Sequence, residues 1–133
     1  KICNALEGCS KDKKIAVLGL TFKPETDDMR DAPSITILPK LIEKGVKISA
    51  HDPQGTNEAK RILPSEIRFY DDIYKTIDEA DAVVLMTEWN VYRNLDMELI
   101  KSKLKTPIFI DLRNVYEPKK MKELGFNYFS IGR

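Results

Sequence analysis

The chain has 133 residues, of which 42% are hydrophobic and 32% charged, a composition typical of one globular domain with its own core. Its formal net charge is only +1, so no broad basic field favours nucleic acid as a partner. No apolar run approaches the roughly 20 residues of a membrane span, and the opening Lys-Ile-Cys-Asn-Ala-Leu lacks the apolar stretch of a secretory signal. The two cysteines, Cys3 and Cys9, fit neither a disulfide framework nor a zinc pattern, which favours free thiols and a cytoplasmic location.

The first twelve residues are expected to be the end of a connecting helix followed by a linker. Ile2 and Leu6 recur at helical spacing, and Gly8 and Ser10 loosen the pattern. Because the pattern begins partway through a helix, we expect a longer protein of which residues 13–133 form the domain proper.

From Lys14 onward, short apolar segments rich in valine and isoleucine alternate with amphipathic segments. The apolar segments predict strands buried on both faces, at 15–20, 46–51, 82–87 and 108–111, with a weaker one at 128–131. The amphipathic segments predict helices at 34–44, 56–63, 71–79, 96–104 and 118–124. This alternation implies right-handed crossovers, so the predicted fold is α/β: a three-layer, Rossmann-like, doubly wound, mostly parallel sheet of five to six strands.

The segment between the first strand and the first helix, residues 19–33, is long for such a connection and heavily charged. Ligands of doubly wound sheets bind beyond the carboxyl ends of the strands, where this segment begins. A dinucleotide-binding turn would read G-x-G-x-x-G, but only Gly19 is present, so the usual phosphate cradle is missing. Lys23 is the first cation available instead, and Pro24 restricts its backbone to extended conformations. The alternative for Lys23 is a solvated surface lysine.

Arg30 lies among four acidic residues of the same segment, Glu25, Asp27, Asp28 and Asp31. One interpretation is an exposed ion-pair cluster that shapes the loop. The other is an arginine that carboxylates hold toward a ligand phosphate or a neighbouring domain.

Further candidates follow the later strands. Arg113 is a possible phosphate or ribose contact that Asp111 orients, or else a partner in an internal salt bridge. Asp52 occupies the place of a ribose-binding acid, but a turn through Asp52-Pro-Gln-Gly is favoured. Structural roles are likewise favoured for His51 and Trp89. No arrangement of residues predicts a catalytic site that makes or breaks covalent bonds, or a metal site. The residues alone therefore indicate a binding domain for an anionic small molecule.

Several segments in order resemble the C-terminal UDP-binding domain of the UDP-glucose/GDP-mannose dehydrogenase family. These are Gly-Leu-Thr-Phe-Lys-Pro-Glu-Thr-Asp-Asp-Met-Arg-Asp-Ala-Pro at 19–33, His-Asp-Pro at 51–53, Ala-Asp-Ala-Val-Val-Leu-Met-Thr-Glu-Trp at 80–89, Ile-Asp-Leu-Arg-Asn-Val-Tyr-Glu-Pro at 110–118 and Phe-Ser-Ile-Gly-Arg at 129–133. The resemblance extends over residues 13–133 and is greatest to bacterial members that oxidise UDP-glucose.

The resemblance implies part of an enzyme that oxidises the C6 alcohol of a nucleotide sugar to a carboxylate with two NAD. The family's catalytic cysteine and most of its NAD site lie on domains absent from this chain, so the chain alone is expected to be inactive and to contain no catalytic residue. The implied partners are UDP-glucose and the other domains of the same protein, in an enzyme that forms a homo-oligomer, without nucleic acid or membrane. The alternatives are the same domain of a GDP-mannose or UDP-N-acetylmannosamine dehydrogenase, a stand-alone nucleotide-binding module, or a structural domain.

The family's functional positions can be matched individually. Phe22 and Lys23 match a Phe-Lys pair that contacts the UDP-sugar, and Arg113 matches the arginine of an Asp-Gly-Arg segment that also contacts substrate. Arg30 matches the arginine that reaches toward NAD on the N-terminal domain. Leu112 departs from the family, because glycine is usual there and leucine leaves the backbone beside Arg113 less free.

Overall fold

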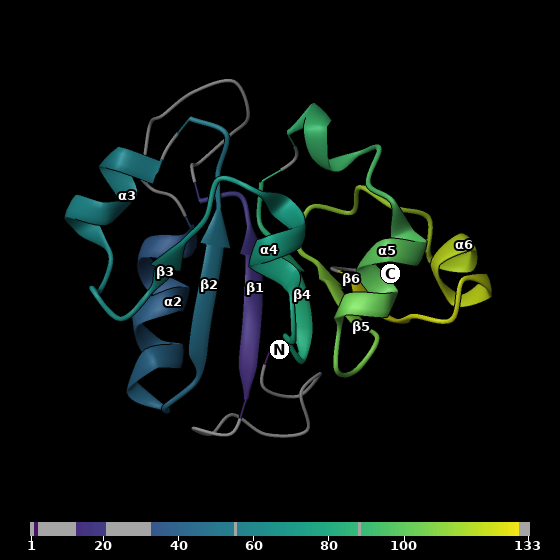
Figure 1. Cartoon of the computed structure of the whole chain (residues 1–133), viewed down its shortest axis with the longest axis horizontal. Coiled ribbons are helices and arrows are strands. Elements are labelled where there is room, and N and C mark those ends of the chain that lie inside the picture. The colour runs from purple at the N-terminus through teal and green to yellow at the C-terminus, as the bar shows by residue number, and fades with distance from the viewer. Residues whose placement is uncertain (1, 3–12, 21–32, 55, 88, 131–133) are drawn as a thin grey trace.

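A computed structural model describes residue 2 and residues 13–20, 33–54, 56–87 and 89–130. Strands and helices alternate along the chain (Figure 1). In order they are β1 (Lys14–Leu18), α2 (Pro33–Glu43), β2 (Lys47–His51), α3 (Thr56–Ile62), β3 (Arg68–Phe69), α4 (Ile73–Ile77), β4 (Ala82–Leu85), the 3₁₀ turn η1 (Asn90–Tyr92), α5 (Met97–Lys103), β5 (Ile108–Asp111), α6 (Pro118–Glu123) and β6 (Asn127–Ser130).

The six strands form one sheet in the order β3-β2-β1-β4-β5-β6, and every neighbouring pair is parallel. The predicted Rossmann-like, doubly wound fold is therefore confirmed, with a fully parallel sheet. The chain runs outward from β1 to β3 and then returns to place β4 on the other side of β1. A binding crevice is expected at this reversal, beyond the carboxyl ends of β1 and β4.

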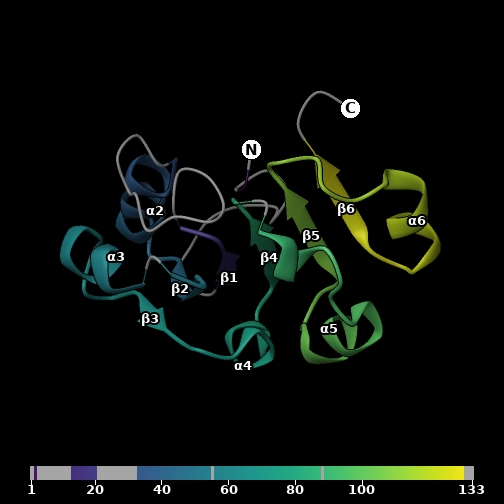
Figure 2. The same ribbon diagram turned by 90° about the horizontal axis from the view of Figure 1, so that it is seen from above.

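Helices cover both faces of the sheet, as Figure 2 shows for α2 on one face and α4 and α5 on the other. Alternate residues of β1 face the two layers: Ile15 and Val17 belong to the core cluster under α2 and α3, and Ala16 and Leu18 to the cluster under α4, α5 and α6. The central strands β1, after Lys14, and β4 are buried on both sides, which explains why Ile15–Leu18 and Ala82–Leu85 are apolar at every position.

The predicted helices and strands are confirmed, with ends that differ by at most two residues. The sequence patterns did not predict β3, because Arg68 and Phe69 are too few to show a period and only one of them is apolar. The helix expected to begin at residue 71 begins instead at Ile73, because the Asp72 carboxylate caps it by accepting the N–H groups of Tyr74 and Lys75.

The helix end expected within residues 1–12 lies outside the described residues except for Ile2, which is helical and packs in the cluster under α2. In the part of the chain that the structure describes, no helix combines the length and apolarity that crossing a bilayer requires.

Candidate functional site

The turn after β1 lies at the reversal of strand order and packs tightly against the end of β4. Gly19 adopts φ +91°, and a Cβ atom at this position would lie 2.5 Å from the Cβ of Thr87 and 2.7 Å from its backbone nitrogen. A left-handed backbone and the close approach of another chain segment both require glycine here. The single glycine of the predicted turn therefore serves packing between β1 and β4.

The backbone N–H groups of this turn are engaged within the protein. Gly19 donates to the carbonyl oxygen of His51 at 2.8 Å, and Leu20 donates to Oδ2 of Asp52 at 2.7 Å. Asp52 is buried, and its other carboxylate oxygen accepts the N–H of Gln54 at 3.0 Å. Asp52 thus joins the turns after β1 and β2, in agreement with the turn role favoured from the sequence.

Both ends of the charged segment are anchored at this edge of the sheet. Its first described end is Leu20, whose carbonyl oxygen accepts a hydrogen bond from Oγ of Ser34 at 2.7 Å. Ser34 is 1% exposed and stands in the first turn of α2. Leu20 and Ser34, which lie on either side of residues 21–32, are therefore both buried and hydrogen-bonded to each other.

A buried aromatic network lies beside the turn after β2. The Nδ1 atom of His51 lies 2.8 Å from the Tyr92 hydroxyl, which also donates to the His51 carbonyl oxygen at 3.0 Å. The hydroxyl of Tyr116 donates to the Tyr92 carbonyl oxygen. Trp89 is 4% exposed and packs in the same core cluster, so the packing role favoured from the sequence is confirmed.

Burial controls the ionisation of this network. It raises the pKa of Tyr92 above its usual range, with a further contribution from the Asp52 carboxylate, and raises the pKa of Tyr116 to about 12. Burial lowers the pKa of His51 below its ordinary 6.5, against the opposing charges of Asp52 and Asp71. The network is therefore neutral near pH 7 and holds the strand ends together without a charge of its own.

His51 is the only histidine, so its titration can be followed by proton NMR without overlap from another residue. Because its pKa is lower in the folded chain than the ordinary 6.5, the unfolded chain binds more protons as the pH falls. Its contribution to stability is complete above about pH 6.5 and is lost as the pH falls toward the folded pKa. We expect the His51 ring to titrate below pH 6.5. When the pH is lowered from about 7 to about 5.5, the free energy of unfolding should fall less in His51→Gln than in the wild type. A midpoint at or above 6.5 would contradict this prediction.

Arg113 is the one predicted site residue that the structure describes, and it follows the end of β5. Asp111 is fully buried and accepts the backbone N–H of Arg113 at 3.0 Å and that of Tyr116 at 2.9 Å. The Tyr128 hydroxyl lies 2.6 Å from the same carboxylate. Asp111 therefore holds the backbone of Arg113 at the carboxyl edge, and the Arg113 side chain is half-buried.

The leucine at 112 is compatible with this turn. The described residues other than glycine with a positive φ are Glu79 and Asn114, so the left-handed residue after β5 is Asn114, at φ 55°, and not Leu112. Asparagine tolerates this conformation better than most residues. The departure from the family's glycine therefore imposes no backbone penalty on Arg113.

Phe22, Lys23 and Arg30, the other predicted contacts, lie outside the described residues, as do Cys3 and Cys9. In the sheet, β4 lies between β1 and β5, so two strand spacings separate β5 from β1. The chain segments that follow β1 and β5 therefore begin at the same edge of the sheet, about 10 Å apart. Within the described ranges, no group of three or more His, Cys, Asp or Glu residues could hold a metal ion.

Sequence reasoning missed the residues that build this edge: Ser34, Tyr92, Tyr116 and Tyr128. Their partners lie 12 to 41 positions away in the chain. No local pattern carries such a signal, since a tyrosine after a strand looks the same whether its hydroxyl is buried or solvated.

Comparison with known proteins agrees with this geometry. The family model described as "UDP-glucose/GDP-mannose dehydrogenase family, UDP binding domain" matches residues 16–118. The UDP-glucose 6-dehydrogenase of Rhizobium meliloti is 44% identical over 133 residues, which are all of this chain and 30% of that protein. The chain thus spans about 30% of the length of this curated relative.

Two solved structures share the fold. The NDP-N-acetyl-D-galactosaminuronic acid dehydrogenase of Methanosarcina mazei superposes with a TM-score of 0.83 at 30% identity, over 98% of this chain and 27% of that one. A UDP-glucose dehydrogenase from Pyrobaculum islandicum gives a TM-score of 0.75 at 26% identity, over 96% of this chain and 27% of that one. The anchored turns at the carboxyl edge, the strand order and the family match lead to one conclusion: the chain belongs to the UDP-glucose/GDP-mannose dehydrogenase family and represents its UDP-binding domain.

Proposed function

We propose that the chain is the nucleotide-sugar-binding domain of an NAD-dependent dehydrogenase that oxidises UDP-glucose to UDP-glucuronate with two NAD. The observation that carries the proposal is the engagement of the Gly19 and Leu20 N–H groups by His51 and Asp52. A diphosphate at this edge cannot use those amides, so its charge has to be met by cationic side chains.

Lys23 and Arg113 are the proposed cations for the nucleotide sugar, with Phe22 as a further contact. Lys23 is three residues beyond Leu20, so its Cα atom lies within about 11 Å of the anchored turn. Arg113 leaves the same edge from a backbone that Asp111 fixes at 3.0 Å. A side-chain cation on each side of the crevice replaces the glycine cradle of a dinucleotide-binding domain.

NAD does not fit the described turn, because the turn lacks the three-glycine cradle and Asp52, the candidate ribose ligand, holds backbone amides instead. We therefore assign the NAD site to another domain of the same protein, with Arg30 reaching toward it. Arg30 is four residues from Ser34, which limits the distance between their Cα atoms to about 14 Å.

This domain is proposed to bind and orient the substrate, while the cysteine nucleophile belongs to a part of the protein outside this chain. The isolated chain is therefore inactive on this account. The full enzyme is proposed to be a cytoplasmic homo-oligomer. UDP-glucose is favoured over the sugar of the Methanosarcina mazei relative because the 44% identical Rhizobium meliloti protein is a UDP-glucose 6-dehydrogenase.

The two arginines provide the test in the full-length enzyme. Arg113→Ala is expected to raise the Michaelis constant for UDP-glucose by about tenfold to a hundredfold with little change for NAD, because it removes a charged hydrogen bond to the sugar nucleotide. Arg30→Ala is expected to act mainly on NAD. Steady-state kinetics with each ligand varied in turn measure both effects.

Arg61→Ala is the matched control, since Arg61 lies on α3 and its guanidinium pairs with Glu58 at the surface. It should change neither constant. If Arg30→Ala raised only the constant for the sugar nucleotide, the assignment of the two arginines would be reversed. If neither arginine affected the sugar nucleotide while UDP-N-acetylmannosamine or GDP-mannose served as the better substrate, the proposed substrate would be wrong.

A further inference from the structure

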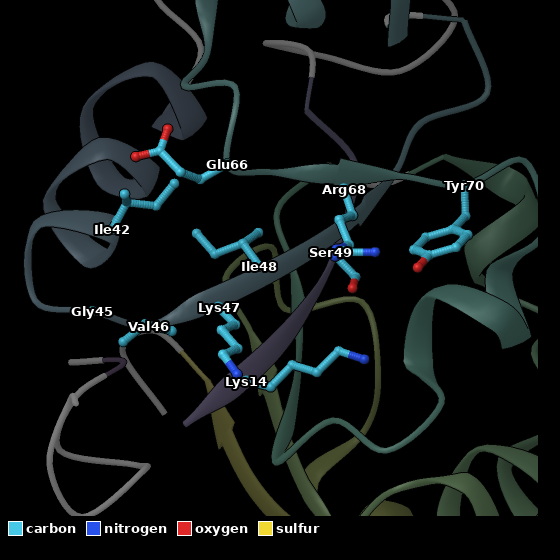
Figure 3. A pocket seen from close by; sticks show the side chains of 10 residues that line it. All are labelled: Lys14, Ile42, Gly45, Val46, Lys47, Ile48, Ser49, Glu66, Arg68 and Tyr70. Carbon is cyan, nitrogen blue, oxygen red and sulfur yellow. The ribbon is translucent and has the colours of Figure 1, made fainter. Parts of the chain in front are cut away.

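A hollow of about 680 Å³ lies away from the carboxyl edge of the sheet, where the chain enters β1, β2 and β3. Figure 3 shows the ten residues that line it. They are Lys14, Ile42, Gly45, Val46, Lys47, Ile48, Ser49, Glu66, Arg68 and Tyr70. Its volume is in the range of pockets that hold small ligands.

Three cations gather on one face of this hollow because of the sheet register. Lys14 of β1 is the register partner of Lys47 of β2, and Arg68 of β3 is the partner of Ser49, two residues further along β2. Residues two apart in a strand share a face, so the side chains of Lys47 and Ser49 point the same way. Adjacent strands lie about 4.8 Å apart.

The acidic groups near these cations compensate them only in part. Glu66 is the one acidic residue among those that line the hollow, and Figure 3 shows it toward Ile42 of α2, at the end away from the two lysines. The Asp81 carboxylate is a second acidic group, and it accepts the backbone N–H of Lys14 at 2.8 Å. The Nζ atom of Lys14 donates to the carbonyl oxygen of Asp78 at 3.0 Å, which leaves further donors on the ammonium. Like charges at neighbouring positions on adjacent strands destabilise a sheet.

Small residues lie between the cations on this face of the sheet. Ala16 and Ser49 are register partners between the cations, and Ser49 is 1% exposed. The helix that covers this face, α4, extends only from Ile73 to Ile77, and Tyr70 forms the wall beside it. The lining of the hollow therefore combines the three cations with the Ser49 hydroxyl, the Tyr70 ring and an apolar side formed by Ile42, Val46 and Ile48.

We propose that this hollow is a second anion site, which binds a phosphate-bearing small molecule with at least two negative charges. Lys14, Lys47 and Arg68 supply the charge, and the ligand relieves the repulsion between the two neighbouring lysines. The site is independent of the nucleotide-sugar crevice, because its cations stand at the amino-terminal starts of the strands, whereas Gly19 and Arg113 follow the carboxyl ends.

Pyrophosphate is the probe, titrated calorimetrically into the 133-residue chain at low ionic strength. Saturable binding is expected, and Lys47→Gln and Arg68→Gln should each weaken it by about tenfold or more. Lys119→Gln, on α6, and Arg61→Gln, on α3, are the matched controls and should weaken it less than about twofold. No saturable binding up to about 10 mM would overturn the proposal, and so would weakening by Arg113→Gln alone, because the probe would then occupy the crevice.

The ligand-free chain gives a separate readout that does not depend on the proposed function. Lys47→Gln removes the repulsion with Lys14, so its thermal midpoint at low salt should rise by about 1–4 °C. Lys119→Gln should leave the midpoint unchanged. A fall of the midpoint in Lys47→Gln would contradict the charge crowding on which the proposed site rests.

Discussion

Replacing Gly19 by alanine is expected to lower the free energy of unfolding of the chain by about 2–5 kcal/mol. The left-handed backbone at φ +91° costs a residue with a Cβ about 1–2 kcal/mol. The added atom would also lie 2.5 Å from the Cβ and 2.7 Å from the backbone nitrogen of Thr87, where only a shift of β4 could make room. Overpacking of this kind costs about 1–3 kcal/mol more.

Gly125→Ala separates the cost of the left-handed backbone from the cost of the steric contact. Gly125 has nearly the same backbone conformation, at φ +94°, but its added Cβ would meet the flexible end of Lys101, with Nζ at 2.5 Å. That side chain can move aside at the expense of its exposed hydrogen bond to the Leu124 carbonyl oxygen, so the backbone cost of about 1–2 kcal/mol is expected to dominate.

Urea unfolding of both variants gives the comparison through their midpoints and slopes. Equal losses for Gly19→Ala and Gly125→Ala would mean that the close approach of the turn after β1 to Thr87 does not constrain the fold.

The architecture could be predicted because it depends on short-range patterns. Strands such as Ala82–Leu85 are apolar at every position since both faces are buried, and capping residues such as Asp72 and Asp96 stand at the helix starts. The strand β3 could not be predicted, since two residues at a sheet edge show no period. Its place in the sheet follows only from pairing with Ser49 and Ala50 of β2.

The candidate site was predictable only in outline. The single glycine, the turn at Asp52 and the cation after β5 are visible in the sequence, together with the edge of the sheet at which they meet. The bond from Leu20 to the Asp52 carboxylate joins residues 32 positions apart, and that from His51 to Tyr92 joins residues 41 apart. Such contacts arise from the folded arrangement, as does the charge crowding of Lys14 and Lys47, which depends on register.

Lys23→Ala in the full-length protein is expected to weaken UDP-glucose binding by about 1.5–3 kcal/mol, or about tenfold to a hundredfold. The two amides of the turn just before Lys23 are engaged by His51 and Asp52, so a diphosphate at this edge depends on side-chain cations. Lys23 is the first cation after β1, and the proline that follows it restricts its backbone. Its loss should leave NAD affinity and thermal stability nearly unchanged.

Two further variants test whether the geometry of the cation at position 23 matters and whether the loss of a lysine elsewhere has the same effect. Lys23→Arg is expected to restore binding only in part, because a planar guanidinium cannot occupy a point-charge site with the same geometry. Lys119→Ala removes an exposed lysine on α6 that is not among the proposed contacts, and should bind UDP-glucose as the wild type does.

The most direct measurement is a calorimetric titration of the full-length protein with UDP-glucose, comparing wild type with Lys23→Ala. The dissociation constant is expected to be raised by about tenfold to a hundredfold in the variant, at an unchanged thermal midpoint. Wild-type affinity in Lys23→Ala would contradict the account, since Lys23 would then be a solvated surface lysine and the charge of the diphosphate would be met elsewhere.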